Sequence, residues 1–159
     1  MPFTEVNHYV PQWHQRLFLS PNEKEAKLHY LDLTPDQIRG KNGKLYTMNA
    51  YRRLGPVNCF CEKNLYTLTF GEQASDVIER YFFGEIDRKG AEAVKLCADY
   101  EFGKHGAECL QTLAFYLDAQ KLRTPKGLEF RRVRYPGRTH QDTLYLMGHL
   151  SKMHMTIWM

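Results

Sequence analysis

The sequence predicts an α+β fold, in which a small N-terminal antiparallel sheet or hairpin is followed by several helices. Up to about residue 70, short stretches of alternating apolar and polar residues are separated by Gly- and Asn-containing turns, as is typical of strands. Beyond Gly71, apolar residues recur at helical spacing. With 159 residues, 43% of them hydrophobic, the chain can bury one sizeable core, so a single domain over residues 1–159 is expected.

The N-terminal half is expected to contain one short helix and two or three strands. Pro11 can occupy the first turn of a helix, because its missing N–H costs nothing there. Strands are expected over 28–33 and 44–51, and the shortest connection makes them an antiparallel pair around Gly40-Lys-Asn-Gly43, in which Asn-Gly favours positive φ. Residues 34–37 have an alternative as a helical turn capped by Thr34.

The remaining elements follow from the same patterns. Residues 59–70 are expected to form one more strand. Helices are expected over 74–86, 90–100, 106–122 and 140–159, and residues 131–138 are expected to form a basic loop. Pro125 and Gly127 are expected to end the third of these helices.

Composition restricts the classes of function. The formal charge of +4, from 22 basic and 18 acidic residues, is compatible with an anionic partner but does not demand one. Neither a membrane helix nor a secretory signal is expected, so we expect a cytoplasmic protein. The spacing of the cysteines fits neither a zinc ribbon nor a disulfide framework, and the spacing of the late histidines does not fit a helical zinc site, so no metal is expected: Cys59, Cys61, Cys97, Cys109; His140, His149, His154.

A polar cluster near the N-terminus, His8-Tyr-Val-Pro-Gln12 followed by Arg16, is the first candidate site. His8 beside a Tyr-Val-Pro turn has the chemistry of a general base, a metal ligand or a phosphate donor. Alternatively, its ring nitrogens tie the N-terminus to a nearby carbonyl. Gln12 can orient a ligand, or it can satisfy backbone groups as buried amides usually do.

A second polar cluster, Gln120-Lys-Leu-Arg123-Thr-Pro125, ends the long helical pattern. Gln120 and Arg123 are three residues apart and share a helix face. Arg123 can bind carboxylate or phosphate through two nitrogens, or it can cap its own helix and pair with a glutamate. Glu62 is the expected acidic partner, because Glu79 and Glu85 lie six residues apart and are not expected to face the same way.

The basic segment after Pro125 is the strongest nucleic-acid signal in the sequence. Basic side chains interleaved with aromatic ones can pair with phosphates and stack on bases. The alternative is a solvated run of charge. The residues are Lys126, Phe130, Arg131, Arg132, Arg134, Tyr135 and Arg138.

Three motifs in order, His8-Tyr-Val-Pro-Gln12 with Arg16 and Phe18, then Glu62-Lys-Asn-Leu-Tyr66, then Gln120-x-x-Arg123-Thr-Pro125, resemble the domain-of-unknown-function family 4238. The resemblance covers roughly residues 7 to 125. Members of that family are usually longer and carry a later Ser-Asp-x-Pro segment, which this chain lacks. The resemblance therefore implies that the chain is the N-terminal portion of a longer family fold, and it implies no established activity.

Two hypotheses for function follow. The first is an enzyme acting on nucleic acid or a phosphorylated ligand, and the alternative is a non-catalytic binding or protein-interaction module with a structural buried polar network. No cofactor is identified, and the oligomeric state is left open. The expected catalytic residues are His8, Gln12, Gln120 and Arg123, and the expected binding residues are Arg16, Glu62, Arg131, Arg132 and Arg134.

Overall fold

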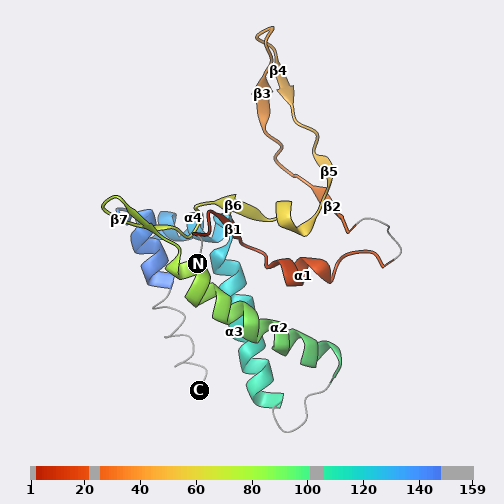
Figure 1. The fold of residues 1–159 in the computed structure, drawn as a ribbon. Coiled ribbons are helices and arrows are strands. Elements are labelled where there is room, and N and C mark those ends of the chain that lie inside the picture. Colours follow the sequence, from red (N-terminus) through yellow and green to blue (C-terminus); the bar gives the residue numbers. More distant parts are fainter. Residues whose placement is uncertain (1–2, 22–25, 101–105, 148–159) are drawn as a thin grey trace. The chain divides into compact units, whose positions relative to one another are not determined.

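A computed structural model describes residues 3–21, 26–100 and 106–147 of the protein. It confirms the α+β class, with small two-stranded antiparallel sheets followed by helices (Figure 1). The chain divides into two compact units, unit 1 being Met1–Pro11 with Cys61–Met159 and unit 2 being Gln12–Phe60. A single domain over residues 1–159 stays a prediction, and each unit is described by itself.

Unit 2 contains a short helix and a long hairpin. The expected short helix is present, but α1 begins at Gln12, so Pro11 lies directly before the helix. The elements are α1 (Gln12–Arg16), β2 (Leu28–Leu31), β3 (Gln37–Arg39), β4 (Leu45–Thr47), β5 (Tyr51–Leu54) and a 3₁₀ turn, η1 (Pro56–Asn58).

The strand pairing in this hairpin differs from the prediction. The expected turn is present, with Gly43 at φ 77°, but it joins β3 to β4, while β2 pairs with β5. Between the two ladders, residues 33–35 lie opposite the single residue Asn49. The Asp32 N–H donates to the Ala50 carbonyl on one side of this bulge, and the Met48 N–H donates to the Asp36 carbonyl on the other. The Asp32 side chain accepts a hydrogen bond from the Thr34 N–H at 3.1 Å, and Pro35 has no N–H to donate. Residues 34–37 therefore form an irregular bulge and the start of β3, and the helical-turn alternative is wrong.

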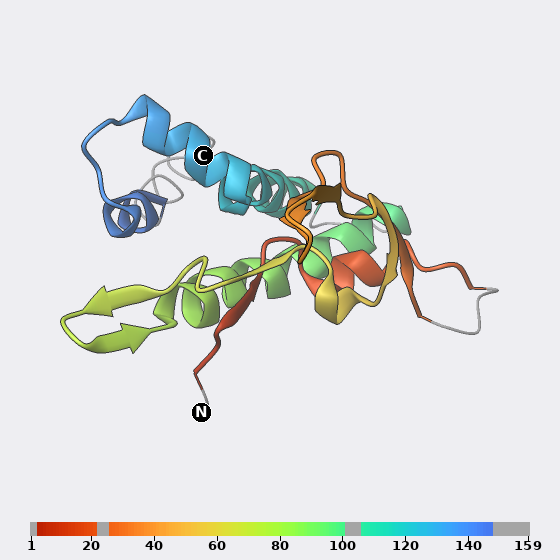
Figure 2. The same ribbon diagram turned by 90° about the horizontal axis from the view of Figure 1, so that it is seen from above.

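The expected strand over 59–70 is broken in unit 1. Strand β6 (Cys61–Lys63) pairs with β1 (Val6–His8), and β7 (Leu68–Phe70) pairs with β8 (Gln73–Ser75) as a separate hairpin (Figure 2). The chain turns between β6 and β7 because Asn64 adopts a positive φ of 56°, which asparagine tolerates better than most residues.

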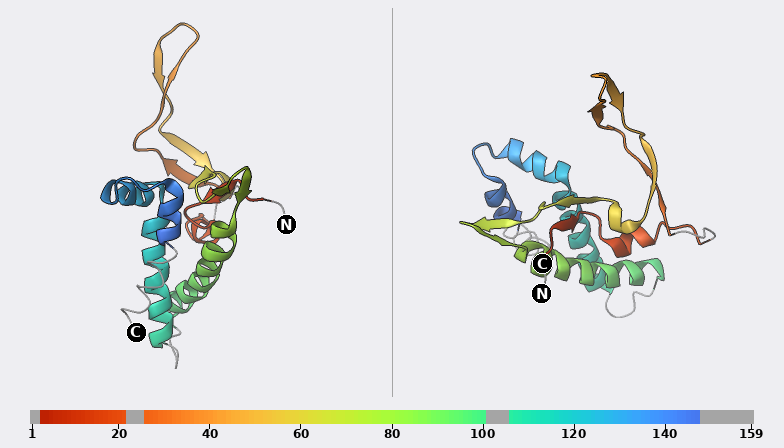
Figure 3. Two further views of the ribbon diagram at one scale, coloured as in Figure 1. Left: turned by 90° about the vertical axis from the view of Figure 1, so that its left-hand side faces the viewer. Right: turned by 45° about the horizontal axis from the view of Figure 1, so that its top comes forward.

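The helices of unit 1 begin with a π-helical turn, η2 (Ile78–Phe83), that runs directly into α2 (Gly84–Ala98). The expected separate helices over 74–86 and 90–100 are therefore one helical run, since Gly90 lies inside α2 rather than between helices. Helix α3 (Gly106–Arg123) confirms the strongest helix prediction, and it lies beside α2 (Figure 3). Within the expected C-terminal helix, residues 140–147 are helical, and residues 148–159 lie outside the described residues.

The expected basic loop is also wrong in its first part, because Pro125–Arg134 forms helix α4. Thr124 caps this helix, its hydroxyl accepting the Gly127 N–H at 3.0 Å, and Pro125 occupies the first turn. The residues expected to end one helix therefore begin the next.

The core of unit 1 lies between α2, α3, α4, residues 140–147 and the β6–β7 connection. Among the residues that the structure describes, no helix is long and apolar enough to cross a membrane. The most deeply buried side chains of this core are Tyr66, Leu68, Phe83, Tyr116, Arg123, Leu128, Leu144 and Met147.

Candidate functional site

Arg123, the last residue of α3, lies in a buried and charged region of unit 1. Its side chain is 1% exposed. One terminal nitrogen donates to the Asp87 carboxylate at 2.6 Å, and the other donates to the His8 carbonyl oxygen at 2.5 Å. The guanidinium therefore joins α3 to α2 and to the end of β1.

Two aromatic rings cover the same guanidinium. Its carbon lies 4.5 Å from the Phe83 ring centre and 6.0 Å from that of Tyr66, distances typical of cation–π contacts. The Tyr66 hydroxyl donates to the main-chain carbonyl of Arg123 itself. Burial raises the pKa of Tyr66 above its ordinary value, and the neighbouring Arg123 charge opposes that rise.

A second carboxylate, Glu79, belongs to the same electrostatic environment as Asp87. Eight residues separate the two, about 2.2 turns of α-helix, which alone would place them about 80° apart around the axis. The intervening π-helical turn takes more residues per turn and so brings them toward one side. We call the group Tyr66, Glu79, Phe83, Asp87 and Arg123 the Arg123 cluster.

Glu79 has a raised pKa of about 7. Burial is the main cause, the charges of Asp87 and Asp76 add to it, and Arg123 acts in the opposite direction. One oxygen of the Glu79 carboxylate is buried without a hydrogen-bond partner in the described part of the chain. An unpaired buried carboxylate favours the protonated form.

Asn7 anchors β1 to this region. It is 1% exposed, and its side-chain oxygen accepts the Tyr66 N–H at 3.1 Å. The strand that carries the His8 carbonyl is thus held both by Asn7 and by Arg123. Both bonds link positions more than 50 residues apart in sequence.

The structure brings part of the expected catalytic set together. His8 contributes its backbone carbonyl to Arg123. Gln120 instead donates its side-chain N–H to the Tyr116 hydroxyl at 2.9 Å, and its side-chain oxygen is buried without a partner among the described residues. Both remaining residues of the N-terminal motif, Gln12 and Arg16, belong to unit 2, where Arg16 donates to the Gln12 side chain at 3.3 Å.

The expected acidic partner of Arg123 is wrong. The carboxylate is that of Asp87, whereas Glu62 lies on β6 as an exposed residue. The expectation that Glu79 and Glu85 face apart is consistent with their surroundings, because Glu85 pairs with Arg88 on the exposed side of α2. The sequence marks Asp87 only as a charged residue near two buried positions of the same helix, Ile86 and Gly90, and does not identify it as the partner of Arg123.

The arginines of the expected basic loop lie on α4 and differ in exposure. Arg131 is 6% exposed, burial lowers its pKa, and one of its terminal nitrogens has no hydrogen-bond partner in the described ranges. Arg132 pairs with Glu129 at 3.0 Å, and Arg134 is exposed. A phosphate cannot reach Arg131 without rearrangement. Arg131, Arg132 and Arg134 therefore do not form one exposed binding surface.

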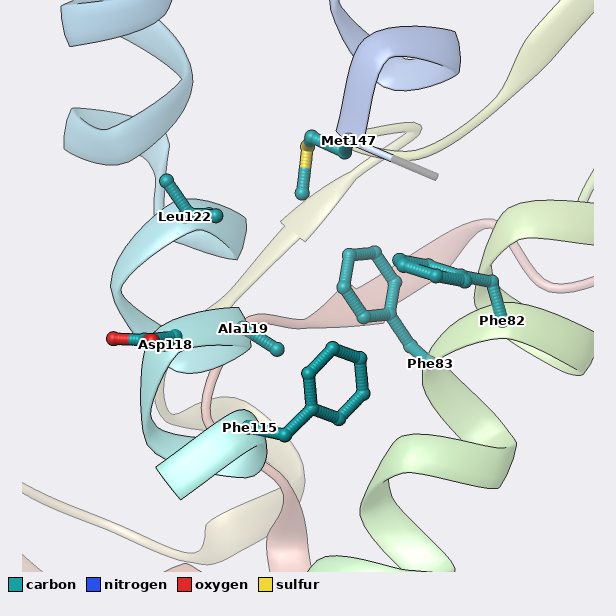
Figure 4. A pocket seen from close by; sticks show the side chains of 7 residues that line it. All are labelled: Phe82, Phe83, Phe115, Asp118, Ala119, Leu122 and Met147. Atoms are coloured by element: carbon teal, nitrogen blue, oxygen red, sulfur yellow. The ribbon is translucent and has the colours of Figure 1, made fainter. Parts of the chain in front are cut away.

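A small cavity of about 20 Å³ borders Phe83, which also contacts Arg123. Figure 4 shows the phenyl rings gathered around this space. The volume corresponds to about one water molecule, so the cavity is too small for a substrate. It is lined by Phe82, Phe83, Phe115, Asp118, Ala119, Leu122 and Met147.

Within the ranges that the structure describes, no group of three or more His, Cys, Asp or Glu side chains could hold a metal ion. His140 is occupied in another way, since its ring Nε2 lies 2.9 Å from the Leu65 carbonyl oxygen. Comparisons of the chain with protein-family models, with curated proteins and with solved structures found no match.

Proposed function

We propose that this protein is a non-catalytic binding module in which the Arg123 cluster is a structural network. The observation that carries this proposal is the position of Arg123, 1% exposed, with both terminal nitrogens bonded to groups of the same chain. Because the side chain is buried, a phosphate or carboxylate ligand cannot reach its remaining N–H groups without displacing these partners. The bonds of Arg123 instead tie β1, α2 and α3 together.

The alternative, an enzyme acting on nucleic acid or a phosphorylated ligand, receives less support from this geometry. An acid/base role for His8 requires its ring to reach a reacting group, but its contribution to the cluster is a backbone carbonyl. The neighbouring cavity has room for about one water molecule. The expected orienting amide, Gln120, is turned toward Tyr116.

We also propose that the resemblance to the domain-of-unknown-function family 4238 reflects membership of that family. Each of the three motifs contributes one residue to the same network: His8 from the first, Tyr66 from the second and Arg123 from the third. The convergence of motifs separated by more than 50 residues supports a shared structural role for them. It supports no particular reaction.

Replacement of Arg123 by lysine tests the structural role. Lysine keeps the positive charge but its single nitrogen cannot reproduce the two-sided contact with Asp87 and the His8 carbonyl. We expect the free energy of unfolding to fall by about 2–4 kcal/mol, measured by urea denaturation followed by circular dichroism. The matched control is Lys121→Ala, because Lys121 on the same helix is 77% exposed and should change stability by less than about 0.5 kcal/mol. An Arg123→Lys protein as stable as the parent would contradict the proposal.

A further inference from the structure

The net charge of the chain resides in unit 2. Unit 2 holds eight basic and four acidic residues, a net charge of +4, whereas unit 1 holds fourteen of each. The imbalance is concentrated further in the hairpin. From β3 to the end of unit 2, residues 37–60 include five Lys or Arg and no Asp or Glu. A polyanion is the kind of partner that such a distribution attracts.

Three of these five basic residues lie at the tip of the hairpin. We call residues 37–47 the β3–β4 ribbon. Every residue of β3 and β4 is exposed. Arg39, Lys41 and Lys44 lie at or beside the turn, and none of them forms an ion pair with a described residue. Three cations are therefore presented to solvent on one short ribbon. Figure 1 shows the backbone of this ribbon, β3 and β4.

The tip is held in shape by its own contacts. The Gly40 N–H donates to the Lys44 carbonyl at 2.8 Å, and the Asn42 side chain donates to the Tyr46 hydroxyl at 2.7 Å. The Tyr46 ring lies so close to Gly40 that a Cβ there would approach the ring to 2.6 Å. An aromatic ring that is 48% exposed is thus fixed beside the cations.

The base of the hairpin uses its charge differently. Arg52 pairs with Asp32 at 3.4 Å and lies over the Tyr30 ring at 5.3 Å. His29 Nδ1 lies 2.6 Å from the Tyr51 hydroxyl. Arg53, also at the base, has an interaction of its own within the chain. The three cations at the tip are therefore the ones best placed to contact a phosphate backbone.

The two faces of the ribbon each carry a cation. Ile38 is directly opposite Tyr46, so these two share one face, and Lys44 continues the face of Tyr46 because it lies two residues before it. Arg39 is opposite Leu45 on the other face. A protein segment that binds an anionic membrane typically has one apolar face, with basic residues around it. Cations on both faces instead match a groove that has phosphates along both walls.

We propose that the β3–β4 ribbon binds duplex DNA, with Arg39, Lys41 and Lys44 on the phosphates that border a major groove. The major groove of B-DNA admits a two-stranded ribbon, whereas that of A-form RNA is too deep and narrow. The proposal rests on the binding-module function and names its partner. It moves the nucleic-acid surface from the expected segment, which includes the buried Arg131, to unit 2.

Fluorescence anisotropy of the whole chain with a labelled 20-base-pair duplex of mixed sequence tests this proposal. Three phosphate contacts predict a slope of about −2.7 for log K against log salt concentration, and so an affinity about 40-fold lower at 200 mM than at 50 mM salt. The triple variant Arg39→Gln, Lys41→Gln, Lys44→Gln should bind more than about tenfold more weakly at 50 mM salt, with a slope near zero. Its circular dichroism spectrum should be unchanged, because the substituted side chains are exposed.

The control is a triple variant with the same change of net charge on α4: Lys126→Gln, Arg132→Gln, Arg134→Gln. We expect its affinity for the duplex to stay within about threefold of the parent at 50 mM salt. Equal losses in the two variants would overturn the proposal, because binding would then follow net charge rather than the ribbon. Tighter binding to the corresponding single strand, or to phosphatidylserine vesicles, would also overturn it.

The absence of duplex binding at 50 mM salt overturns the DNA proposal alone. The structural role of the Arg123 cluster is tested separately, by the stability of the Arg123→Lys protein. A stable Arg123→Lys protein that still bound the duplex through the ribbon would instead leave the DNA surface intact and remove the structural network. The two failures are therefore distinguishable.

Discussion

The Arg123 guanidinium and the Asp87 carboxylate lie 2.6 Å apart, although 36 residues separate them in sequence. The arginine side chain is 1% exposed and the aspartate side chain 20%. Because Arg123 ends α3 and Asp87 lies in α2, the pair links two neighbouring helices. The same guanidinium reaches the His8 carbonyl, so the ion pair also holds the N-terminal strand.

Asp87→Asn should lower the free energy of unfolding by about 2–3 kcal/mol at pH 7. The substitution keeps the shape of the side chain but removes the carboxylate that is bonded to the buried guanidinium, which is more costly than the loss of an exposed pair. Urea denaturation followed by circular dichroism measures the change. Glu85→Gln is the matched control, since Glu85 pairs with Arg88 on the exposed face of the same helix and should change stability much less. Equal effects of the two substitutions would remove the special role of Asp87.

Tyr66→Phe should lower stability by about 1–3 kcal/mol. The change removes only the hydroxyl that donates to the Arg123 carbonyl and leaves a buried acceptor unsatisfied. Thermal unfolding followed by circular dichroism provides the measurement. Tyr145→Phe removes a hydroxyl from a residue that is 44% exposed and should leave the melting temperature unchanged within about 1 °C. A Tyr66→Phe protein that melts with the parent would show that the bond contributes nothing.

Glu79→Gln should raise stability at neutral and alkaline pH but not in acid. The pKa of Glu79 is raised from 4.5 to about 7, so between these values the folded state retains a proton that the unfolded state has released. The stabilisation is therefore complete below about pH 4.5 and is lost as the pH rises to about 7. Glutamine resembles the protonated acid at every pH. We expect the variant to be more stable than the parent by about 2–3 kcal/mol at pH 8 and equal to it at pH 4.

The pH dependence of urea unfolding from pH 4 to pH 8 tests this expectation. Glu92→Gln, an exposed substitution further along α2, should give a curve parallel to that of the parent. Parallel curves for Glu79→Gln as well would show that Glu79 titrates alike in the folded and unfolded states.

Gly90→Ala and Gly84→Ala should have opposite effects on stability. A Cβ at Gly90 would lie 2.3 Å from the Tyr116 ring, so alanine there forces α2 and α3 apart and should destabilise by about 1–3 kcal/mol. At Gly84 the nearest atom to a Cβ is the Glu79 carbonyl oxygen at 3.6 Å, and the backbone is helical. Alanine should therefore stabilise that position by up to about 1 kcal/mol. Chemical denaturation compares the two, and a neutral Gly90→Ala would contradict the close approach of the helices.

Several elements follow from local sequence alone. The bounds of α3 are predicted within one residue, because a long helical repeat of apolar residues is an unambiguous signal. The turn at Gly43 is predicted because Asn-Gly adopts positive φ at little cost. Thr124-Pro125, by contrast, is compatible with both the end of one helix and the start of the next, and the structure uses it for both.

The candidate site is predicted only in part for the same reason. The importance of Arg123 is visible in the sequence, since an arginine beside Gln120 at the end of an apolar helix needs a partner. The identity of that partner is not visible, because Glu62, Glu79 and Asp87 are all available acids and each lies more than 30 residues away. The π-helical turn that brings Glu79 and Asp87 toward one side has no distinct periodic signal in so short a segment.

The sequence by itself determined the α+β class, the clearest helix, the hairpin turn and the chemistry-bearing residues, because propensities, capping and turn preferences act over a few neighbouring positions. Only the tertiary structure decided that β2 pairs with β5, that Arg131 is buried, and that Arg123 binds Asp87 and the His8 carbonyl. These contacts depend on which groups, distant in sequence, are brought together when the chain packs. A buried guanidinium takes the acceptors that the folded chain places within reach, and distance along the sequence does not specify them.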